Sequence, residues 1–222
     1  GRAGRVALGI AYRLWTKGEE GGLSPYPPAE IEAADLAGLA LEIALWGAEP
    51  TEMPFLTPPP DGAFAEAQSL LRFLGALDDE NRITAHGRNL STLPLHPRLA
   101  HMMNLGGPKA ANLAALLSDR DPLIGASTDL ALRLDALRDP RGFSDRRPEQ
   151  INRGALERIR TEAKRLSQSI RTRQKPTGKY QDFNDAELAA LAYPDRIGLR
   201  RKGEAARFQL SGGKGAVMED HD

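Results

Sequence analysis

The apolar residues between positions 149 and 170 recur at the spacing of an α-helix, and this pattern constrains the fold more than any other feature. They form one stripe at steps of three and four residues: Leu156, Ile159, Ala163, Leu166 and Ile170. A helix gains most of its stability by packing such a stripe on other elements. Aromatic residues make up only 5% of the chain, so the core must be built mainly from Leu, Ala and Ile, which favours further helices over strands.

The first half of the chain predicts helices at about 29–46 and 64–74, followed by a short strand, an acidic turn and a return strand within 75–84. Thr84 is placed to cap a further helix that runs to Leu93. Two helices, a small β wing and a helix follow one another in the order of a winged-helix-like unit.

The second half predicts a helical bundle, with helices near 98–105, 109–118, 128–138 and 149–170. Asn184 and Glu187 form a candidate capping box for a last helix that ends at about Tyr193. Alternating apolar residues predict a short strand at 6–17, and residues 208–210 and 216–218 predict a hairpin. The expected fold class is therefore mainly α: a winged-helix domain plus a helical-bundle domain, with short β pieces at both ends.

Composition excludes several kinds of site. The chain has no cysteine, which rules out disulfides, thiolate metal sites and a cysteine nucleophile. We predict no metal site, because metal-ligand spacing is absent from the four histidines, His86, His96, His101 and His221. Trp15 and Trp46 lie in apolar periodic runs, which favours packing in the core over stacking on bases. No apolar run is long enough to span a bilayer.

The formal net charge is zero, but basic residues are concentrated in one region. Residues 138–175 hold twelve basic and five acidic side chains, and such a surface can neutralise phosphates and release counterions. Four cations of the long helix recur at spacings of seven, four and seven: Arg153, Arg160, Lys164 and Arg171. We predict that these four bind nucleic acid, and a solvated helix face is the alternative.

The segment Gly1-Arg2-Ala3-Gly4-Arg5 places two arginines three residues apart among small residues, so both can approach a compact anion. On composition alone a flexible, solvated end is the simpler interpretation. The segment also resembles the second half of the sixth conserved motif of superfamily 2 helicases, Q-R-x-G-R-x-G-R, without its Gln-Arg opening.

The rest of the chain resembles the DEAH-box RNA helicases in several ordered segments: 9–15, 29–31, 35–36, 58–60, 70–78, 84–88 and 93–99. Further segments are similar to the bacterial HrpB-type branch: 114–123, 129–134, 192–197, 200–201 and 207–210. The resemblance therefore covers nearly the whole chain.

This resemblance implies the C-terminal accessory region of an ATP-dependent RNA helicase. It divides the chain into the end of a second RecA-like lobe (1–17), a winged-helix domain (18–97), a helical ratchet domain (98–195) and the start of a C-terminal β module (196–222). In such helicases the accessory domains transmit closure of the ATP-binding lobes to the RNA. The implied partners are single-stranded RNA, with other nucleic acid as an alternative, and the RecA-like lobes of the same longer chain. No membrane is implied, and the implied location is cytoplasmic.

By position, Arg2 and Arg5 correspond to family arginines that reach the terminal phosphates of the nucleotide, which makes them catalytic in the parent enzyme. That enzyme would use ATP and Mg. This sequence holds no G-x-x-x-x-G-K-[ST] loop and no D-E-x-H motif, and Gly212-Gly213-Lys214-Gly215 is better explained as a turn. We therefore expect an excised piece that binds no cofactor and hydrolyses no ATP by itself.

Two other interpretations stay open at this point. A free-standing winged-helix nucleic-acid-binding or regulatory protein would explain the wing and the basic helix, but not the arginine motif. A helical scaffold that binds only protein would be indifferent to RNA and to salt.

Overall fold

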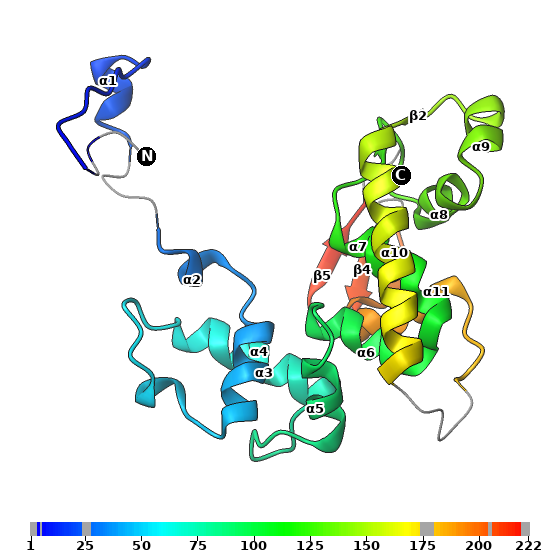
Figure 1. The fold of residues 1–222 in the computed structure, drawn as a ribbon, viewed down its shortest axis with the longest axis horizontal. Coiled ribbons are helices and arrows are strands. Elements are labelled where there is room, and N and C mark those ends of the chain that lie inside the picture. The colour runs from blue at the N-terminus through cyan, green and yellow to red at the C-terminus, as the bar shows by residue number, and fades with distance from the viewer. Residues whose placement is uncertain (1–3, 5, 24–27, 174–179, 204–205, 219–222) are drawn as a thin grey trace.

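The computed structural model describes residues 4, 6–23, 28–173, 180–203 and 206–218 (Figure 1). Helices dominate, and they form two consecutive groups. The first group contains α1 (Lys17–Glu20), α2 (Glu30–Ala33), α3 (Ala37–Trp46), η1 (Pro50–Glu52), α4 (Asp61–Phe73) and α5 (Ala85–Ser91). The second contains α6 (Pro97–Gly106), η2 (Gly107–Ala110), α7 (Ala111–Ser118), α8 (Leu130–Arg138), α9 (Pro140–Arg146), α10 (Arg153–Arg173), α11 (Asp185–Ala192) and η3 (Pro194–Arg196).

Helices α3, α4 and α5 form the smaller unit. Between α4 and α5 the chain reverses, and Leu77 and Ile83 form an isolated antiparallel bridge. Thr84 caps α5 as predicted, because its hydroxyl accepts the Gly87 N–H at 3.0 Å. The elements come in the predicted order, but one bridge does not establish a wing, so the winged-helix domain stays a prediction.

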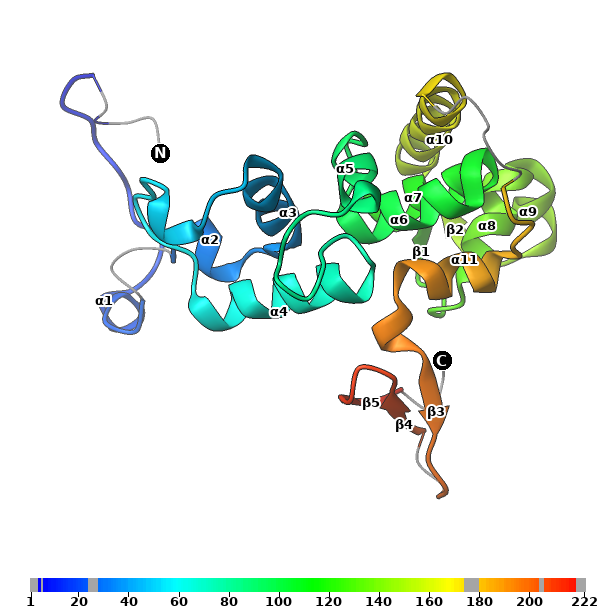
Figure 2. The same cartoon turned by 90° about the horizontal axis from the view of Figure 1, so that it is seen from below.

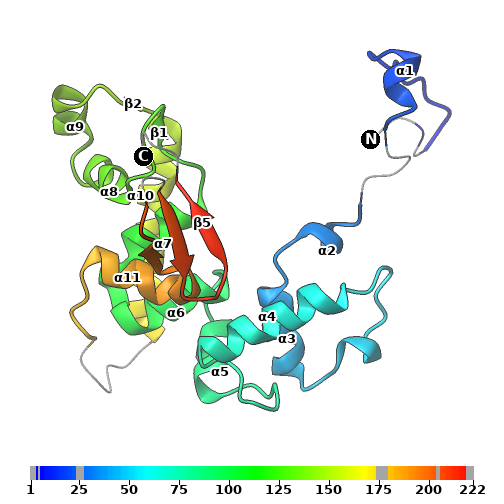
Figure 3. The same cartoon turned by 180° about the vertical axis from the view of Figure 1, so that it is seen from behind.

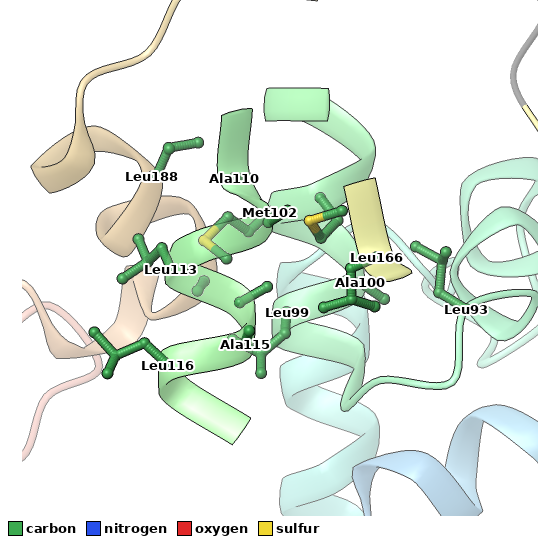
Figure 4. Packing of buried hydrophobic residues seen from close by; sticks show 14 of the residues in the cluster. Leu93, Leu99, Ala100, Met102, Ala110, Leu113, Ala115, Leu116, Leu166 and Leu188 are labelled. Carbon is green, nitrogen blue, oxygen red and sulfur yellow. The ribbon is translucent and has the colours of Figure 1, made fainter. Parts of the chain in front are cut away.

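Helices α6 and α7 lie at the centre of the larger unit, with α10 packed along α7 and α11 packed on α6. Figure 4 shows this packing, with Leu99 and Met102 of α6 and Leu113 of α7 among the buried side chains of the cluster. The predicted apolar stripe of α10 is confirmed as core, since each of its five residues is at most 4% exposed.

One buried cluster joins the two groups of helices. It continues from Leu41 of α3 and Leu71 of α4 through Leu93 to Leu99 of α6 and Leu188 of α11. Helices α3 to α11 therefore share one continuous apolar core.

Two small antiparallel sheets complete the fold. Strand β1 (Leu123–Ile124) pairs with β2 (Gln150–Ile151). Strands β3 (Gly198–Arg200), β4 (Arg207–Leu210) and β5 (Gly215–Val217) form a three-stranded sheet in that order, which stands off the helices beside α6 and α11 (Figure 2). The predicted hairpin is confirmed as β4 and β5, whereas the three residues of β3 were too few to show a strand period.

The single helix predicted at 29–46 is wrong, because the chain forms α2 and α3 with a break between them. Ala34 is extended, with ψ at 156°, and Asp35 Oδ1 accepts the Ala37 N–H at 2.8 Å. An aspartate that binds nearby backbone N–H groups competes with the helical hydrogen bonds and starts a new helix.

The strand predicted at 6–17 is also wrong. Residues 6–15 form neither helix nor strand, and Thr16 caps α1 instead. A strand needs a neighbour to take its backbone hydrogen bonds, and within the described part of the chain no strand pairs with this segment. The segment and α1 lie apart from the helical body (Figure 3), and its apolar side chains are almost fully exposed, as at Val6, Leu8 and Leu14.

Two further predictions need correction, and one helix was not predicted. Trp15 and Trp46 do not pack in the core, since they are 49% and 65% exposed, one in the uncovered segment and one at the end of α3. The long helix begins at Arg153 rather than at 149, because β2 uses the residues before it. Helix α9 was not predicted, although Asp139 caps it and Pro140 occupies its first turn.

Candidate nucleic-acid interface

The four cations predicted to bind nucleic acid lie on one side of α10. At about 100° per residue, Arg153, Arg160, Lys164 and Arg171 fall within roughly 40° of one another, and at about 1.5 Å per residue they cover about 27 Å of helix. They lie roughly 100° around the helix from the buried stripe, so they project beside the packed face. We call these four residues the α10 basic stripe.

Most of the charge of the α10 basic stripe is uncompensated. Arg160 meets Glu157 at 3.3 Å and is partly exposed. Arg153, Lys164 and Arg171 are exposed, and none forms an ion pair with any residue that the structure describes. An exposed cation without a carboxylate partner remains available for a phosphate oxygen.

The other exposed flank of α10 carries cations that are already neutralised. Arg158 donates to both carboxylate oxygens of Asp119, at 3.1 and 2.9 Å, and Arg165 donates to both oxygens of Glu162, at 2.7 and 2.5 Å. These hydrogen bonds lower the pKa of Asp119 and of Glu162 below their ordinary values. The sequence places cations on both flanks of the helix, and the structure shows that those of the second flank are paired.

A second group of exposed cations lies on the three-stranded sheet, and the sequence analysis did not name it as a binding site. Arg200 ends β3, Arg201 and Lys202 follow it, and Arg207 begins β4. Arg201 donates to the side-chain oxygen of Gln209, and none of the four forms an ion pair with a described residue. We call these four the hairpin cluster. The uninterrupted run from Arg200 to Lys202 was the sequence signal that could have found it.

Arg98 joins two segments that carried the family resemblance. Its side chain is only 9% exposed and donates to both carboxylate oxygens of Asp195, with 3.0 Å for Nη2 to Oδ2. It also donates to the Ala192 carbonyl at 3.3 Å and lies 5.2 Å from the ring centre of Tyr193. The hydrogen bond from Arg98 lowers the pKa of Asp195. This pair fixes the start of α6 to the chain after α11, so these residues hold the fold.

Arg133 makes a comparable structural pair with Asp121. Nη2 of Arg133 lies 2.6 Å from Oδ2 of Asp121, and its Nη1 donates to the carbonyls of Ser127 and Asp129. Burial opposes ionisation of Asp121, but hydrogen bonds from Arg133 and from the Leu123 N–H outweigh it and lower the pKa.

His86 and His101 meet at the junction of α5 and α6. His86 Nε2 lies 2.8 Å from His101 Nδ1, and the rings are edge to face with centres 5.0 Å apart. A hydrogen bond between two imidazoles requires one ring to be neutral and accept. Burial and the nearby charge of His86 lower the pKa of His101 to about 4, and burial lowers the pKa of His86. The contact is therefore one between neutral rings at neutral pH.

Arg2 and Arg5 lie outside the described residues, so the structure does not place the predicted catalytic arginines. Among the residues it does describe, no three or more possible ligands gather to hold a metal ion. A helix both long and apolar enough to cross a bilayer is likewise missing from the described ranges.

Comparison with known proteins identifies the family. The chain is 32% identical over its whole length to the ATP-dependent RNA helicase HrpB of Escherichia coli. A crystal structure of the E. coli DExH-box NTPase HrpB matches 98% of the chain with a TM-score of 0.66 and 30% sequence identity. The chain belongs to the HrpB-type branch of the DEAH-box helicases. Its mainly helical fold corresponds to the C-terminal region of HrpB.

Similarity to eukaryotic DEAH-box proteins covers a shorter region. The human probable ATP-dependent RNA helicase DHX34 is 33% identical over 55% of the chain, which is 11% of DHX34. The chain spans about a quarter of HrpB itself, 25% in both the sequence and the structure comparison. No family model matches the chain.

Proposed function

We propose that this chain is the C-terminal accessory region of an ATP-dependent RNA helicase. In that role it couples ATP hydrolysis in two RecA-like lobes to the grip and movement of an RNA strand. The observation that carries the proposal is its likeness to HrpB along the whole chain, in sequence and in fold. ATP and Mg would bind in the full-length protein, and the chain alone would hydrolyse no ATP, since its sequence has no phosphate-binding loop.

In this proposal residues 1–17 belong to the second RecA-like lobe, 18–97 form a winged-helix domain, 98–195 a helical ratchet domain and 196–222 the start of a β module. The exposed apolar side chains of segment 6–15 support the first assignment, because such residues are normally covered by a neighbouring element. The continuous core between α3 and α11 supports a rigid connection between the second and third domains, as transmission of a lobe movement requires.

We further propose that single-stranded RNA binds along the α10 basic stripe. Three of its four cations are exposed without a described carboxylate partner, and the stripe is about 27 Å long at the rise of an α-helix. Backbone phosphates supply the negative charge that this surface lacks, and their binding depends on salt through counterion release.

Fluorescence anisotropy with a labelled single-stranded RNA across a salt series tests the stripe. If all four cations contact phosphate, the logarithm of affinity falls with the logarithm of salt at a slope of about −2.8, since each contact on a single strand contributes about −0.7. Lys164→Gln with Arg171→Gln removes two contacts and reduces the slope by about 1.4.

The matched control lies on the same helix. Arg158→Gln with Arg165→Gln removes the same charge from the paired flank, so it leaves the salt slope unchanged. Equal loss of RNA affinity in both double variants would mean that RNA binding depends only on the net charge of the protein. If the protein binds no RNA at any salt concentration, a scaffold that binds only protein would be favoured.

The comparisons weigh against the free-standing winged-helix interpretation. The identity to HrpB extends through the helical bundle and the β strands, beyond the region that a winged-helix unit would occupy. In the full-length protein Arg2 and Arg5 would stabilise charge that develops on the transferred phosphoryl group. We also propose a cytoplasmic location, in keeping with the absence of cysteine.

A further inference from the structure

The turn between β4 and β5 is hydrogen-bonded to η3. Gly212 donates its backbone N–H to the Asp195 carbonyl at 2.8 Å, and the Ser211 hydroxyl donates to the Pro194 carbonyl. A Cβ atom on Gly212 would lie 2.9 Å from that same carbonyl oxygen, so the two backbones are in direct contact. Residues 211–214 are thus attached to η3 by their first half.

This attachment is rigid because η3 is itself bound to α6 through Asp195. Asp195 accepts two hydrogen bonds from the guanidinium of the buried Arg98, which belongs to α6. Side-chain and backbone contacts therefore connect the turn to the helical body without a gap. The three-stranded sheet is fixed at this point and stands off the helices beyond it (Figure 2).

The second half of the turn reaches α4 through an exposed ion pair. Lys214 Nζ lies 2.8 Å from Glu66 Oε1, and the two side chains are 77% and 72% exposed. The turn and α4 enclose a cleft whose walls include Leu70 and Phe73 of α4 and Leu210 of β4. An exposed ion pair contributes little, in contrast to the buried pair that holds η3.

We propose that the sheet of β3, β4 and β5 is a strap that is hinged at η3 and latched to α4 by Lys214 and Glu66. Breaking the latch opens the cleft beside Phe73, while the anchor at Asp195 stays intact. The hairpin cluster lies on the same sheet, so opening the strap changes its position relative to the α10 basic stripe. The effect of this movement on RNA is the one part of the proposal that rests on the proposed function.

Distances between pairs of spin labels test the strap directly, because the chain has no native cysteine to interfere. Labels at Ala65→Cys on α4 and Val217→Cys on β5, both exposed positions, report the width across the latch. Lys214→Glu turns attraction into repulsion, and we expect the ratio of long to short distances to rise about three- to tenfold. The charge-swapped protein with Glu66→Lys and Lys214→Glu restores the short distances.

Two controls make the outcome specific. Lys202→Glu imposes the same charge change on the same sheet without touching the latch, so it leaves the distances unchanged. Labels at Ala65→Cys and Thr161→Cys, which connect α4 with α10, stay at one distance in every variant. An unchanged distribution in Lys214→Glu, or a swapped protein that remains open, would overturn the proposal. RNA affinity plays no part in this readout, so the hinge and the RNA interface can fail independently.

Discussion

Replacing Asp195 with Asn removes the negative partner of Arg98, whose side chain is only 9% exposed. Arg98 keeps the Ala192 carbonyl and a neutral amide, but its charge is no longer balanced. Breaking a buried pair in this way costs about 3–5 kcal/mol. The Asp195 side chain is 32% exposed and water can take over part of its role, so we expect a loss of about 2–3 kcal/mol in the free energy of unfolding.

Urea unfolding followed by far-UV circular dichroism measures this loss as a shift of the midpoint. With an m-value of about 2–3 kcal/mol per molar urea, the midpoint of Asp195→Asn falls by about 1 M. Asp182→Asn is the matched control, because it makes the same chemical change in the pair with Lys109, whose side chains are 85% and 65% exposed. That variant should stay within about 0.5 kcal/mol of the wild type.

The pH dependence supplies an independent check. The folded-state pKa of Asp195 is lowered, so its contribution is complete above its unfolded pKa of about 3.9 and disappears as pH falls through the lower folded value. The gap between wild type and Asp195→Asn should therefore be constant near neutral pH and close below about pH 4. If Asp195→Asn costs no more stability than Asp182→Asn, or if the gap between wild type and Asp195→Asn persists at the lowest pH, the buried pair does not stabilise the fold in this way.

Three further predictions concern two glycines, His101 and the N-terminal arginine motif. Gly87→Ala should destabilise the protein by about 1–3 kcal/mol in urea unfolding, because the new Cβ would lie 2.2 Å from a backbone oxygen, whereas Gly38→Ala, with open space around it, should be neutral or stabilising. His101, whose pKa is lowered to about 4, should make the protein lose stability as pH falls from about 6.5 to 4, and His101→Gln should flatten that part of the pH profile. Replacing Arg2 and Arg5 with Ala in a protein that carries both motor lobes should abolish RNA-stimulated ATP hydrolysis, and retained phosphate release would show the positional assignment to be wrong.

Periodicity predicted the helices well wherever one face is buried. The stripe of α10 and the caps at Thr84 and Asn184 were readable because a helix brings residues three and four apart together. The same rule failed at 29–46, where the side chain of Asp35 takes over a backbone hydrogen bond and breaks an otherwise continuous pattern. A local competitor of this kind leaves no periodic trace.

The predicted strand at 6–17 failed for a different reason. Alternating apolar and polar residues identify a segment that can form a strand. A strand also needs a neighbouring strand, and the sequence of the segment does not say which one it pairs with. The candidate interface shows the same division. The sequence located Arg153, Arg160, Lys164 and Arg171 on one face. The spacing of Glu162 and Arg165, three residues apart on one helix, also allows an ion pair. The sequence offered no sign, however, that the distant Asp119 neutralises Arg158.

The helical character of the chain, the main helix faces and the resemblance to the HrpB-type helicases could all be read from the sequence, because they depend on residues close together in the chain. Only folding brings Asp119 to Arg158, Asp195 to Arg98 and Glu66 to Lys214. These contacts join positions far apart in sequence, and the charge of a side chain does not identify the partner that it meets in the folded protein.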